Sequence, residues 1–444
     1  MTGAPTSEPA TGAPFLDETH WRGLLHQTTG DDALVEHLQA GGRVAYAGFD
    51  PTSDSLHIGN FIPIQLLRLW QQAGHKPIVL MGGGTGLIGD PSGKDSERSL
   101  LTREQVEANV EGQRRIFERL LDFDPANPNA AVIVNNVDWL EPLGYIEVLR
   151  DVGKHFSVNE MIKRDSVRTR LETREQGISY TELSYMILQG YDFLHLRRAM
   201  NCTVQLAGAD QFGNIVSGID LIRRDLGSEE AHAYAITAPL ITRSDGKKMG
   251  KSESGAIWMT ADRTSPYAFY QYWLNVVDDD AVRFLGLFTD LDRDAIEAVR
   301  VEHAARPHER NAQRALATYM TDLLHGDDER KRAETASNAL FTGNVSALDD
   351  GLLQEVFAGV ASSTHARTTL EGEGASLVDV LVETALAKSR REARQYLGDG
   401  AVSINGDRVE GDALMRRLSC SDLLHGRTIL LRRGKKQWHA LRFE

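Results

Sequence analysis

Short apolar runs bounded by turn residues alternate with longer stretches of helical spacing in the first part of the chain. Two such runs, Val44 to Phe49 and Lys76 to Met81, have the length and composition of buried β-strands. Residues 59–73, between them, carry apolar side chains at the spacing of a helix. A strand, a helix and a second strand in this order predict parallel strands joined by a crossover.

Further strands are predicted at residues 131–134 and 233–236, and helical stretches fill most of the intervals. The pattern therefore favours an open α/β sheet. Ligands of such sheets bind beyond the carboxyl ends of the strands, so residues 50–60 and 82–94 are expected at the ligand site.

Turn residues and composition divide the chain further. Residues 1–14 are rich in Pro, Gly, Ala and Thr and lack the basic and apolar regions of a signal peptide, which is typical of a disordered tail. Near the C-terminus, the dipeptide Asn405-Gly406 is a strong hairpin signal. We predict five segments: a disordered tail (1–18), an α/β domain (19–265), a helical domain (266–341), a linker with one short helix (342–375) and a small α+β module (376–444).

Composition narrows the classes of protein that fit. No run approaches the roughly 20 apolar residues that a membrane span requires, so a cytoplasmic location without membrane contact is expected. Only Cys202 and Cys420 are present, which argues against a disulfide framework or a cysteine-rich zinc site. The net charge is -14, yet residues 376–444 hold 13 Lys or Arg against 9 Asp or Glu. A basic segment fits a polyanion footprint or, equally, a solvated basic surface.

Two segments carry the residue types of phosphate chemistry. Residues 51–60 lie between a predicted strand and a predicted helix, where free backbone N–H groups favour phosphate and Thr52 and His57 could donate to it. Residues 244–252 form a glycine-containing turn with Lys247, Lys248 and Lys251, whose ammonium groups could stabilise developing negative charge. Taken singly, the histidine fits an ordinary surface or capping residue and the lysines fit a solvated loop.

Together the two segments resemble the HIGH and KMSKS signatures of the class I aminoacyl-tRNA synthetases, and in particular the bacterial tyrosyl-tRNA synthetase family. The resemblance extends from about Trp21 to the C-terminus. Its most specific stretches are residues 46–52, 86–93, 151–159 and 208–214. Two positions depart from the signatures, because Asn60 replaces the second histidine and Gly250 replaces a serine. Asn can still donate a hydrogen bond and Gly only loosens the loop, so we expect activity to be retained with a possible change in ATP affinity.

Two further patterns were weighed beside this resemblance. Residues 84–89 match the dinucleotide fingerprint GxGxxG, but the helix that should follow is interrupted by Asp90-Pro91, so we predict no nicotinamide or flavin site. Tyr185, Gln189 and Asp192 fall at i, i+4 and i+7 on one face of a predicted helix at 180–196. That face fits a solvated surface or the wall of a small polar pocket.

The resemblance implies a role for each matching residue. Tyrosine is expected to be bound by Tyr46, Asp90, Tyr185, Gln189, Asp192 and Gln211. ATP is expected to be bound by Gly48, Asp50, His57, Asn60, Gly208, Asp210, Lys248 and Lys251. The residues expected to stabilise charge in catalysis are Thr52, His57, Lys248 and Lys251, with Lys94 and Arg98 on a loop near the pyrophosphate.

The resemblance also implies the fold, the activity and the partners. It predicts a Rossmann-like parallel-sheet domain, a helical domain and an S4-like RNA-binding module, in which Lys388, Arg390, Arg391, Arg394, Arg432, Arg433, Lys435 and Lys436 would engage RNA phosphates. ATP would enter with Mg²⁺, without a protein-bound metal or organic cofactor. The partners would be L-tyrosine, ATP, tRNA(Tyr) and a second copy of the chain, not DNA. Two alternatives remain: a tryptophanyl-tRNA synthetase, and a catalytically silent RNA-binding protein on the same scaffold.

Overall fold

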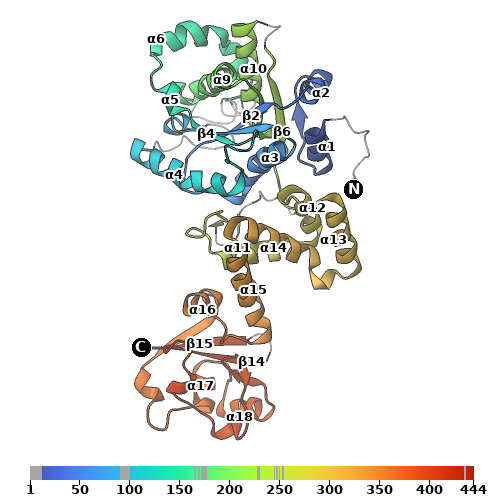
Figure 1. Cartoon of the computed structure of the whole chain (residues 1–444). Coiled ribbons are helices and arrows are strands. Elements are labelled where there is room, and N and C mark those ends of the chain that lie inside the picture. Colours follow the sequence, from blue (N-terminus) through green and yellow to red (C-terminus); the bar gives the residue numbers. More distant parts are fainter. Residues whose placement is uncertain are drawn as a thin grey trace. The chain divides into compact units, whose positions relative to one another are not determined.

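The computed structural model describes residues 13–90, 101–164, 167–168, 171, 178–227, 231–244, 246, 249, 251–252, 255–434 and 437–444 (Figure 1). The chain divides into two units. The first consists of the residues up to Thr264 together with Tyr272–Leu324, and the second of Ser265–Gln271 together with His325–Glu444.

The first unit is built on a six-stranded sheet in the order β1-β6-β5-β2-β3-β4. Strands β2 to β6 are parallel, and only the short β1 is antiparallel to its neighbour. The bounds are β1 Gln27–Thr28, β2 Val44–Phe49, β3 Lys76–Met81, β4 Val132–Asn135, β5 Cys202–Gly208 and β6 Tyr234–Ala238. The predicted parallel sheet is thus confirmed, and β2 and β3 have the predicted bounds.

The strand order reverses between β2 and β5. From β2 the chain proceeds through β3 to β4 on one side, and β5 and β6 follow on the other side. Loops that leave two neighbouring strands in opposite directions open a crevice at the carboxyl edge of the sheet. The fold therefore provides a ligand crevice between the ends of β2 and β5.

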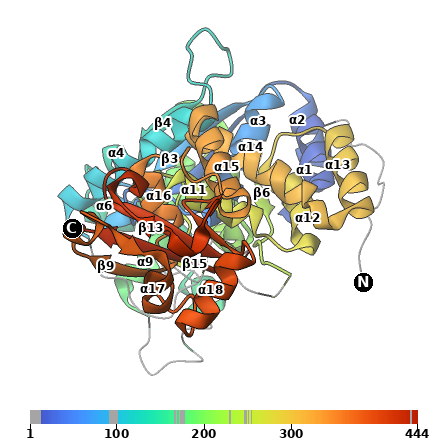
Figure 2. The same cartoon turned by 90° about the horizontal axis from the view of Figure 1, so that it is seen from below.

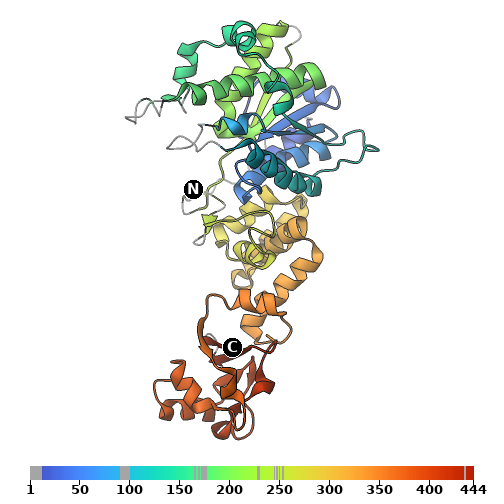
Figure 3. The same cartoon turned by 90° about the vertical axis from the view of Figure 1, so that its left-hand side faces the viewer.

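Helices cover both faces of this sheet (Figures 1 and 3). Helices α3 (Phe61–Gln72) and α4 (Arg103–Leu120) lie on one face, and α9 (Tyr180–Met200) and α10 (Phe212–Leu226) lie on the other. Helix α9 begins with a capping box between Ser179 and Glu182. Such a cap satisfies free N–H groups of the first turn, which fixes where the helix starts.

The N-terminal prediction is wrong in part, because a helix replaces the last residues of the expected tail. Helix α1 spans Pro14–Trp21, with proline at its first position and with Phe15 and Leu16 buried. The rings of Phe15 and Trp70 of α3 meet edge to face at 4.8 Å. Such a short helix is stabilised mainly by packing, which the sequence pattern does not reveal.

Further helices complete the first unit. They are α2 Asp31–Gln39, α5 Val137–Leu140, α6 Tyr145–Glu147, α7 Val158–Lys163, α12 Asp278–Phe288, α13 Arg293–Ala305 and α14 Asn311–His325, while α11 Pro266–Leu274 spans the division between the units. The side chain of Arg22 fastens α1 to the end of α12 by donating to the carbonyls of Gly286, Thr289 and Leu291. None of the described helices is long and apolar enough to cross a membrane.

The second unit contains a five-stranded sheet in the order β12-β11-β14-β15-β9. Its strands are β9 Ala361–His365, β11 Val402–Ile404, β12 Asp407–Arg408, β14 Thr428–Arg433 and β15 Gln437–Phe443. The predicted hairpin at Asn405-Gly406 is present, because both residues have positive φ and Ile404 pairs with Asp407. Helices α17 (Leu377–Glu383) and α18 (Arg390–Gly398) pack together in this unit (Figure 2).

The predicted linker holds more structure than one short helix. Helix α16 (Asp350–Val356) is close to the expected position. In addition, β9 adds in parallel to β15 as an edge strand of the sheet, with Leu441 opposite Ser363. Residues 342–375 are therefore part of the second unit, together with α15 (Asp327–Thr342), and not a separate spacer.

Candidate functional site

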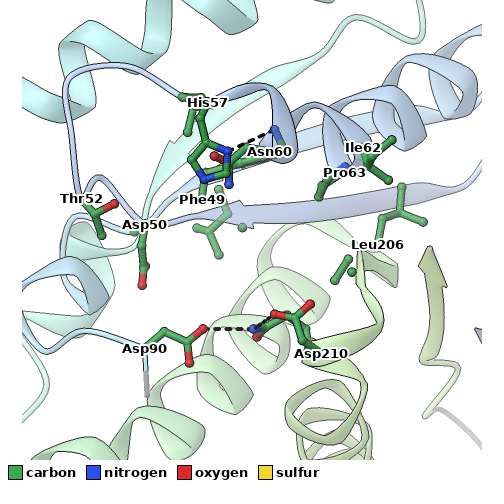
Figure 4. A pocket seen from close by; sticks show the side chains of 18 of the residues that line it. Phe49, Asp50, Thr52, His57, Asn60, Ile62, Pro63, Asp90, Leu206 and Asp210 are labelled. Atoms are coloured by element: carbon green, nitrogen blue, oxygen red, sulfur yellow. Dashed lines mark hydrogen bonds between the residues drawn. The ribbon is translucent and has the colours of Figure 1, made fainter. Parts of the chain in front are cut away.

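A cavity of about 540 Å³ opens at the carboxyl edge of the sheet in the first unit (Figure 4). It lies at the ends of β2 and β5, where the strand order reverses. The structure brings thirteen of the predicted site residues to its wall: Tyr46, Gly48, Asp50, Thr52, His57, Asn60, Asp90, Tyr185, Gln189, Asp192, Gly208, Asp210 and Gln211.

Four predicted residues cannot be placed in this cavity. Lys94, Arg98 and Lys248 lie outside the described residues. Lys251 begins the short strand β7 (Lys251–Ser252), which pairs with β8 (Gly255–Ala256), but its side chain is not described.

His57 occupies the turn between β2 and α3, across the cavity from Asp90 and Asp210 (Figure 4). Its Nδ1 accepts a hydrogen bond from the backbone N–H of Gly59 at 3.1 Å. In a neutral imidazole the other nitrogen, Nε2, then carries the proton and can donate. A Cβ on Gly59 would lie 2.9 Å from the ring of His57, so a larger residue here would displace this ring. The signature turn thus presents a hydrogen-bond donor beside the start of α3.

Asp50, directly after β2, connects helix α9 and the turn after β3 at one end of the cavity. Its carboxylate accepts hydrogen bonds from the hydroxyl of Tyr185 at 2.9 Å and from that of Thr85 at 2.8 Å. Burial, followed by the charges of Asp50 and Asp90, raises the pKa of Tyr185 well above its usual value. Tyr185 therefore stays a neutral donor next to acidic groups.

Side-chain amides continue this polar wall toward Asp210. Gln211 donates to Asp90 at 3.0 Å and to Asp210 at 3.2 Å. The amide of Asn214 donates to both Gln189 and Gln211. The polar groups of α9, of the β5 turn and of the loop after β3 thus form one hydrogen-bonded network around the cavity.

Asp192 lies at the buried end of the cavity, with only 2% of its surface exposed. It accepts hydrogen bonds from the side chains of Asn136 at 2.9 Å and Trp139 at 2.8 Å. Burial raises the pKa of the Asp192 carboxyl to about 7, although these two hydrogen bonds act in the opposite direction. A hydrogen-bond donor supplied by a ligand would therefore stabilise the ionised form of this buried carboxyl group.

Tyr46 lies beside Asp192 at the buried end. Its hydroxyl is fully buried and has no hydrogen-bond partner among the described residues. Burial and then the charge of Asp192 raise the pKa of Tyr46 well above its usual value. An unpaired buried hydroxyl costs free energy, so the site favours a ligand that supplies the missing partner.

Three residues of this region were not predicted from the sequence. Asn136 and Trp139 follow β4 and orient Asp192, and Gln205 lies on β5 opposite Tyr46. Within the described residues, the side-chain oxygen of Gln205 is also buried without a partner. A polar residue inside an apolar strand and an Asn directly after a strand are the signals that could have indicated Gln205 and Asn136.

The GxGxxG segment lies directly after β3. Within the described residues up to Asp90, a 3₁₀ turn at Thr85–Leu87 follows this strand, and no helix. The backbone N–H groups of Gly83 and Gly84 donate to Asn135 and Asn136 at 3.0 and 2.7 Å. These glycines therefore bind the neighbouring loop of the protein, and their contacts hold Asn136 in place.

Comparisons with known proteins agree with this geometry. A family model described as tRNA synthetases class I (W and Y) matches residues 41–342, and one described as the tyrosine–tRNA ligase SYY-like C-terminal domain matches residues 353–441. The tyrosine–tRNA ligase of Rhodopirellula baltica is 46% identical over 440 residues, which cover 99% of this chain and 98% of that protein. That of Bacillus caldotenax is 47% identical over 429 residues, with 97% and 99% covered.

Solved structures give the same picture. A C-terminally truncated mitochondrial tyrosyl-tRNA synthetase of Aspergillus nidulans matches with a TM-score of 0.66 and 29% identity, over 74% of this chain and 94% of that chain. A tryptophanyl-tRNA synthetase of Encephalitozoon cuniculi matches with a TM-score of 0.52 and 16% identity, over 71% and 87%. The second likeness shows a common fold alone.

Proposed function

The chain belongs to the class I tRNA synthetases of tryptophan and tyrosine, and we propose that it activates L-tyrosine with ATP and transfers it to the 3′ end of tRNA(Tyr). The choice of tyrosine as the amino acid rests on two residues at the buried end of the cavity, Asp192 and Tyr46. Asp192 offers a buried carboxylate, and Tyr46 offers a buried hydroxyl without a partner among the described residues. The names of relatives that match almost the whole chain support the same choice.

The phenolic hydroxyl of tyrosine suits this pair. It would donate to the carboxylate of Asp192 and accept from the hydroxyl of Tyr46. Phenylalanine would fill the same space but leave the buried hydroxyl of Tyr46 without a partner and give Asp192 no donor beyond Asn136 and Trp139, which costs binding free energy. The indole N–H of tryptophan could donate but could not accept from Tyr46.

The rest of the cavity wall fits the remaining groups of the two substrates. We assign the tyrosine ammonium to Asp90, Tyr185 and Gln189, and its carboxylate to Gln211. Gly208 and Asp210 would bind the ribose of ATP, since a carboxylate can accept from two hydroxyl groups. The hydrogen bond from Gln211 to Asp210 brings the two substrate subsites into contact.

Activation then joins the two substrates. An oxygen of the tyrosine carboxylate attacks the α-phosphorus of ATP, and the bond from this phosphorus to the β-phosphate oxygen breaks. The products are tyrosyl-adenylate and pyrophosphate. The protein contributes position and charge stabilisation, for which we propose Thr52, His57, Asn60, Lys248 and Lys251, with Lys94 and Arg98 near the pyrophosphate. Mg²⁺ would arrive as the complex of ATP.

Transfer completes the reaction. A hydroxyl of the terminal ribose of tRNA attacks the carbonyl carbon of the adenylate, and the bond to AMP breaks. For tRNA binding we propose the exposed side of α18, with Arg391 and Arg394. We also propose that the protein acts in the cytoplasm, where bacteria such as the sources of its relatives use charged tRNA.

Two of the basic residues predicted to engage RNA, Arg432 and Arg433, make contacts within the second unit. Arg432 stacks on Trp438 at 4.9 Å, and Arg433 stacks on Tyr396 at 5.0 Å and donates to the carbonyl of Leu386. Such contacts place both guanidinium groups within the fold of the second unit. Lys435 and Lys436 lie outside the described residues.

We also propose that two copies of the chain associate. Large apolar side chains are exposed near α6, α7 and the start of α9: Tyr145, Ile146, Leu149, Val158, Ile162, Leu171 and Tyr180. Exposed apolar surface of this kind is typical of an interface. Val158 and Ile162 of this apolar patch fall within residues 153–170, the segment for which the family resemblance implies a homodimer interface, so a second copy is the occupant that we propose.

Exchange of labelled pyrophosphate into ATP, measured with tyrosine, phenylalanine and tryptophan in turn, tests the function. We expect exchange with tyrosine and charging of tRNA(Tyr) when tRNA is added. Exchange driven by tryptophan alone would assign the protein to the other branch of its family. Absence of exchange with all three amino acids would leave an RNA-binding protein without the activity.

A further inference from the structure

The segment after the lysine loop runs back along the segment that carries His57. The backbone N–H of Ile58 donates to the carbonyl of Ile257 at 2.8 Å, and that of Met259 donates to the carbonyl of Leu56 at 2.9 Å. This pairing sets His57 opposite Trp258, and their rings meet edge to face at 6.3 Å. Two stretches about 200 residues apart in sequence are thus joined next to the nucleotide side of the cavity.

Side-chain contacts also join the His57 segment to the segment after the lysine loop. The guanidinium of Arg263 forms an ion pair with Asp54, with 2.6 Å between nitrogen and oxygen. Arg263 also lies over the ring of Trp258 at 5.4 Å. A further hydrogen bond joins the same two segments, because the hydroxyl of Thr260 donates to that of Ser55 at 2.9 Å. Arg263 therefore contacts both the loop before His57 and the residue opposite His57.

Asp54 is itself held by helix α4. Asn109 donates to the carbonyl of Pro51 at 2.8 Å, and Gln113 donates to that of Ser53 at 2.9 Å. A Cβ on Gly112 would lie 2.2 Å from the carbonyl oxygen of Asp54, so glycine alone allows the loop to approach α4 this closely. Helix α4 therefore holds the loop that carries Asp54, and Arg263 pairs with the carboxylate of this loop.

The pairing of these two segments extends to β7, the short strand that contains the proposed catalytic residue Lys251. In the β7–β8 hairpin, Lys251 pairs with Ala256, which directly precedes Ile257. The backbone of Lys251 is therefore linked to the His57 segment through the same stretch that Arg263 fastens. A shift of this stretch would move Lys251 relative to His57.

We propose that Asp54 and Arg263 are positioning residues for adenylate formation, which hold the His57 segment and the Lys251 strand in register. This inference rests on the proposed function. Both side chains of the pair are 43% exposed, and an exposed ion pair contributes little to folding stability. Small misplacements of groups that stabilise charge can nevertheless cost a large factor in rate. The pair therefore acts on the activation step more than on folding.

Arg263→Ala in the full-length protein tests the proposal by tyrosine-dependent pyrophosphate exchange. We expect kcat to fall about tenfold or more and KM for ATP to rise, with KM for tyrosine within about twofold of the wild type. The thermal unfolding midpoint should stay unchanged. Arg263→Lys should keep part of the activity, and the charge-reversed double variant Asp54→Arg with Arg263→Asp should recover activity relative to either single variant.

The matched control is Arg300→Ala, which removes an exposed ion pair with Glu297 of similar length, 2.5 Å, on helix α13. It should leave all constants unchanged. An unchanged kcat in Arg263→Ala, equal effects on tyrosine and ATP, or no recovery in the double variant would overturn the inference. A wild-type protein without tyrosine-dependent exchange would instead refute the proposed function on which it rests.

Discussion

Tyr185 donates its hydroxyl hydrogen bond to Asp50 across 2.9 Å, which joins helix α9 to the residue that follows strand β2. The two residues come from opposite sides of the strand-order reversal, so the bond spans the crevice of the sheet. The carboxylate of Asp50 also accepts from Thr85 after β3. One acidic group after β2 thus joins helix α9 to the turn after β3 at the cavity.

Removal of this hydroxyl should weaken the tyrosine subsite. In Tyr185→Phe, Asp50 loses a donor and the proposed ammonium subsite loses an oxygen, so we expect KM for tyrosine in pyrophosphate exchange to rise about tenfold. The control is Tyr191→Phe, which removes a hydroxyl from the same helix at a position outside the cavity. Equal constants in Tyr185→Phe and the wild type would contradict the assignment.

The raised pKa of Asp192 predicts how its contribution to stability depends on pH. The folded protein holds this proton up to about pH 7, whereas an unfolded chain releases it near 3.8. The folded state therefore binds more protons between these values, and the contribution is complete below pH 4 and lost as pH rises to 7. The wild type should lose unfolding free energy relative to Asp192→Asn between pH 5 and 8, by at most about 3 kcal/mol.

Urea unfolding at the two pH values measures this difference. Because Asn cannot ionise, the comparison with Asp192→Asn cancels the titration of other groups. A wild type that gained stability relative to the variant as pH rose would show that the carboxyl has a lowered pKa, and the description of the buried end would be wrong.

If α18 binds RNA, substitutions on this helix should affect the transfer of tyrosine to tRNA but not the activation of tyrosine with ATP. Arg391→Ala with Arg394→Ala should lower tRNA affinity by about tenfold and reduce its dependence on salt, since each phosphate contact adds about 0.7 to 0.9 to the salt slope. Pyrophosphate exchange should be unchanged. On the same helix, Arg390 already pairs with Asp379 at 2.6 Å, so Arg390→Ala is a matched control with a smaller expected effect.

The apolar patch predicts a change in association. Ile146 is 73% exposed, and Ile146→Asp would place a charge in the proposed interface. Sedimentation velocity should find a dimer for the wild type and a larger monomer fraction for the variant. Val301, which is also exposed but lies on α13, provides the control Val301→Asp. A monomeric wild type would refute the proposed association.

The sequence predicted those parts of the fold that have a local signal. β2 and β3 are continuous apolar runs, because strands of a parallel sheet are buried on both faces. The stripe of Tyr185, Gln189 and Asp192 follows from helical spacing, and the cavity wall contains all three residues. In these cases the spacing of residues along the chain was enough to predict their positions in the fold.

Other contacts depend on the order of strands in space. Tyr46 and Gln205 are neighbours because β2 pairs with β5, and no local pattern determines this pairing. Asn136 and Trp139 reach Asp192 for the same kind of reason, since they follow β4 while Asp192 lies on α9. The edge strand β9 was missed because its polar sequence resembles that of a linker.

The discrimination between tyrosine and phenylalanine tests the central claim most directly, namely that Asp192 and Tyr46 recognise a phenolic hydroxyl. The measurement is the ratio of kcat/KM for the two amino acids in pyrophosphate exchange, in the wild type, Asp192→Asn and Tyr46→Phe. We predict that both variants lower the ratio by at least about tenfold, chiefly through loss of activity with tyrosine. A ratio that stays at the wild-type value in both variants would contradict the account.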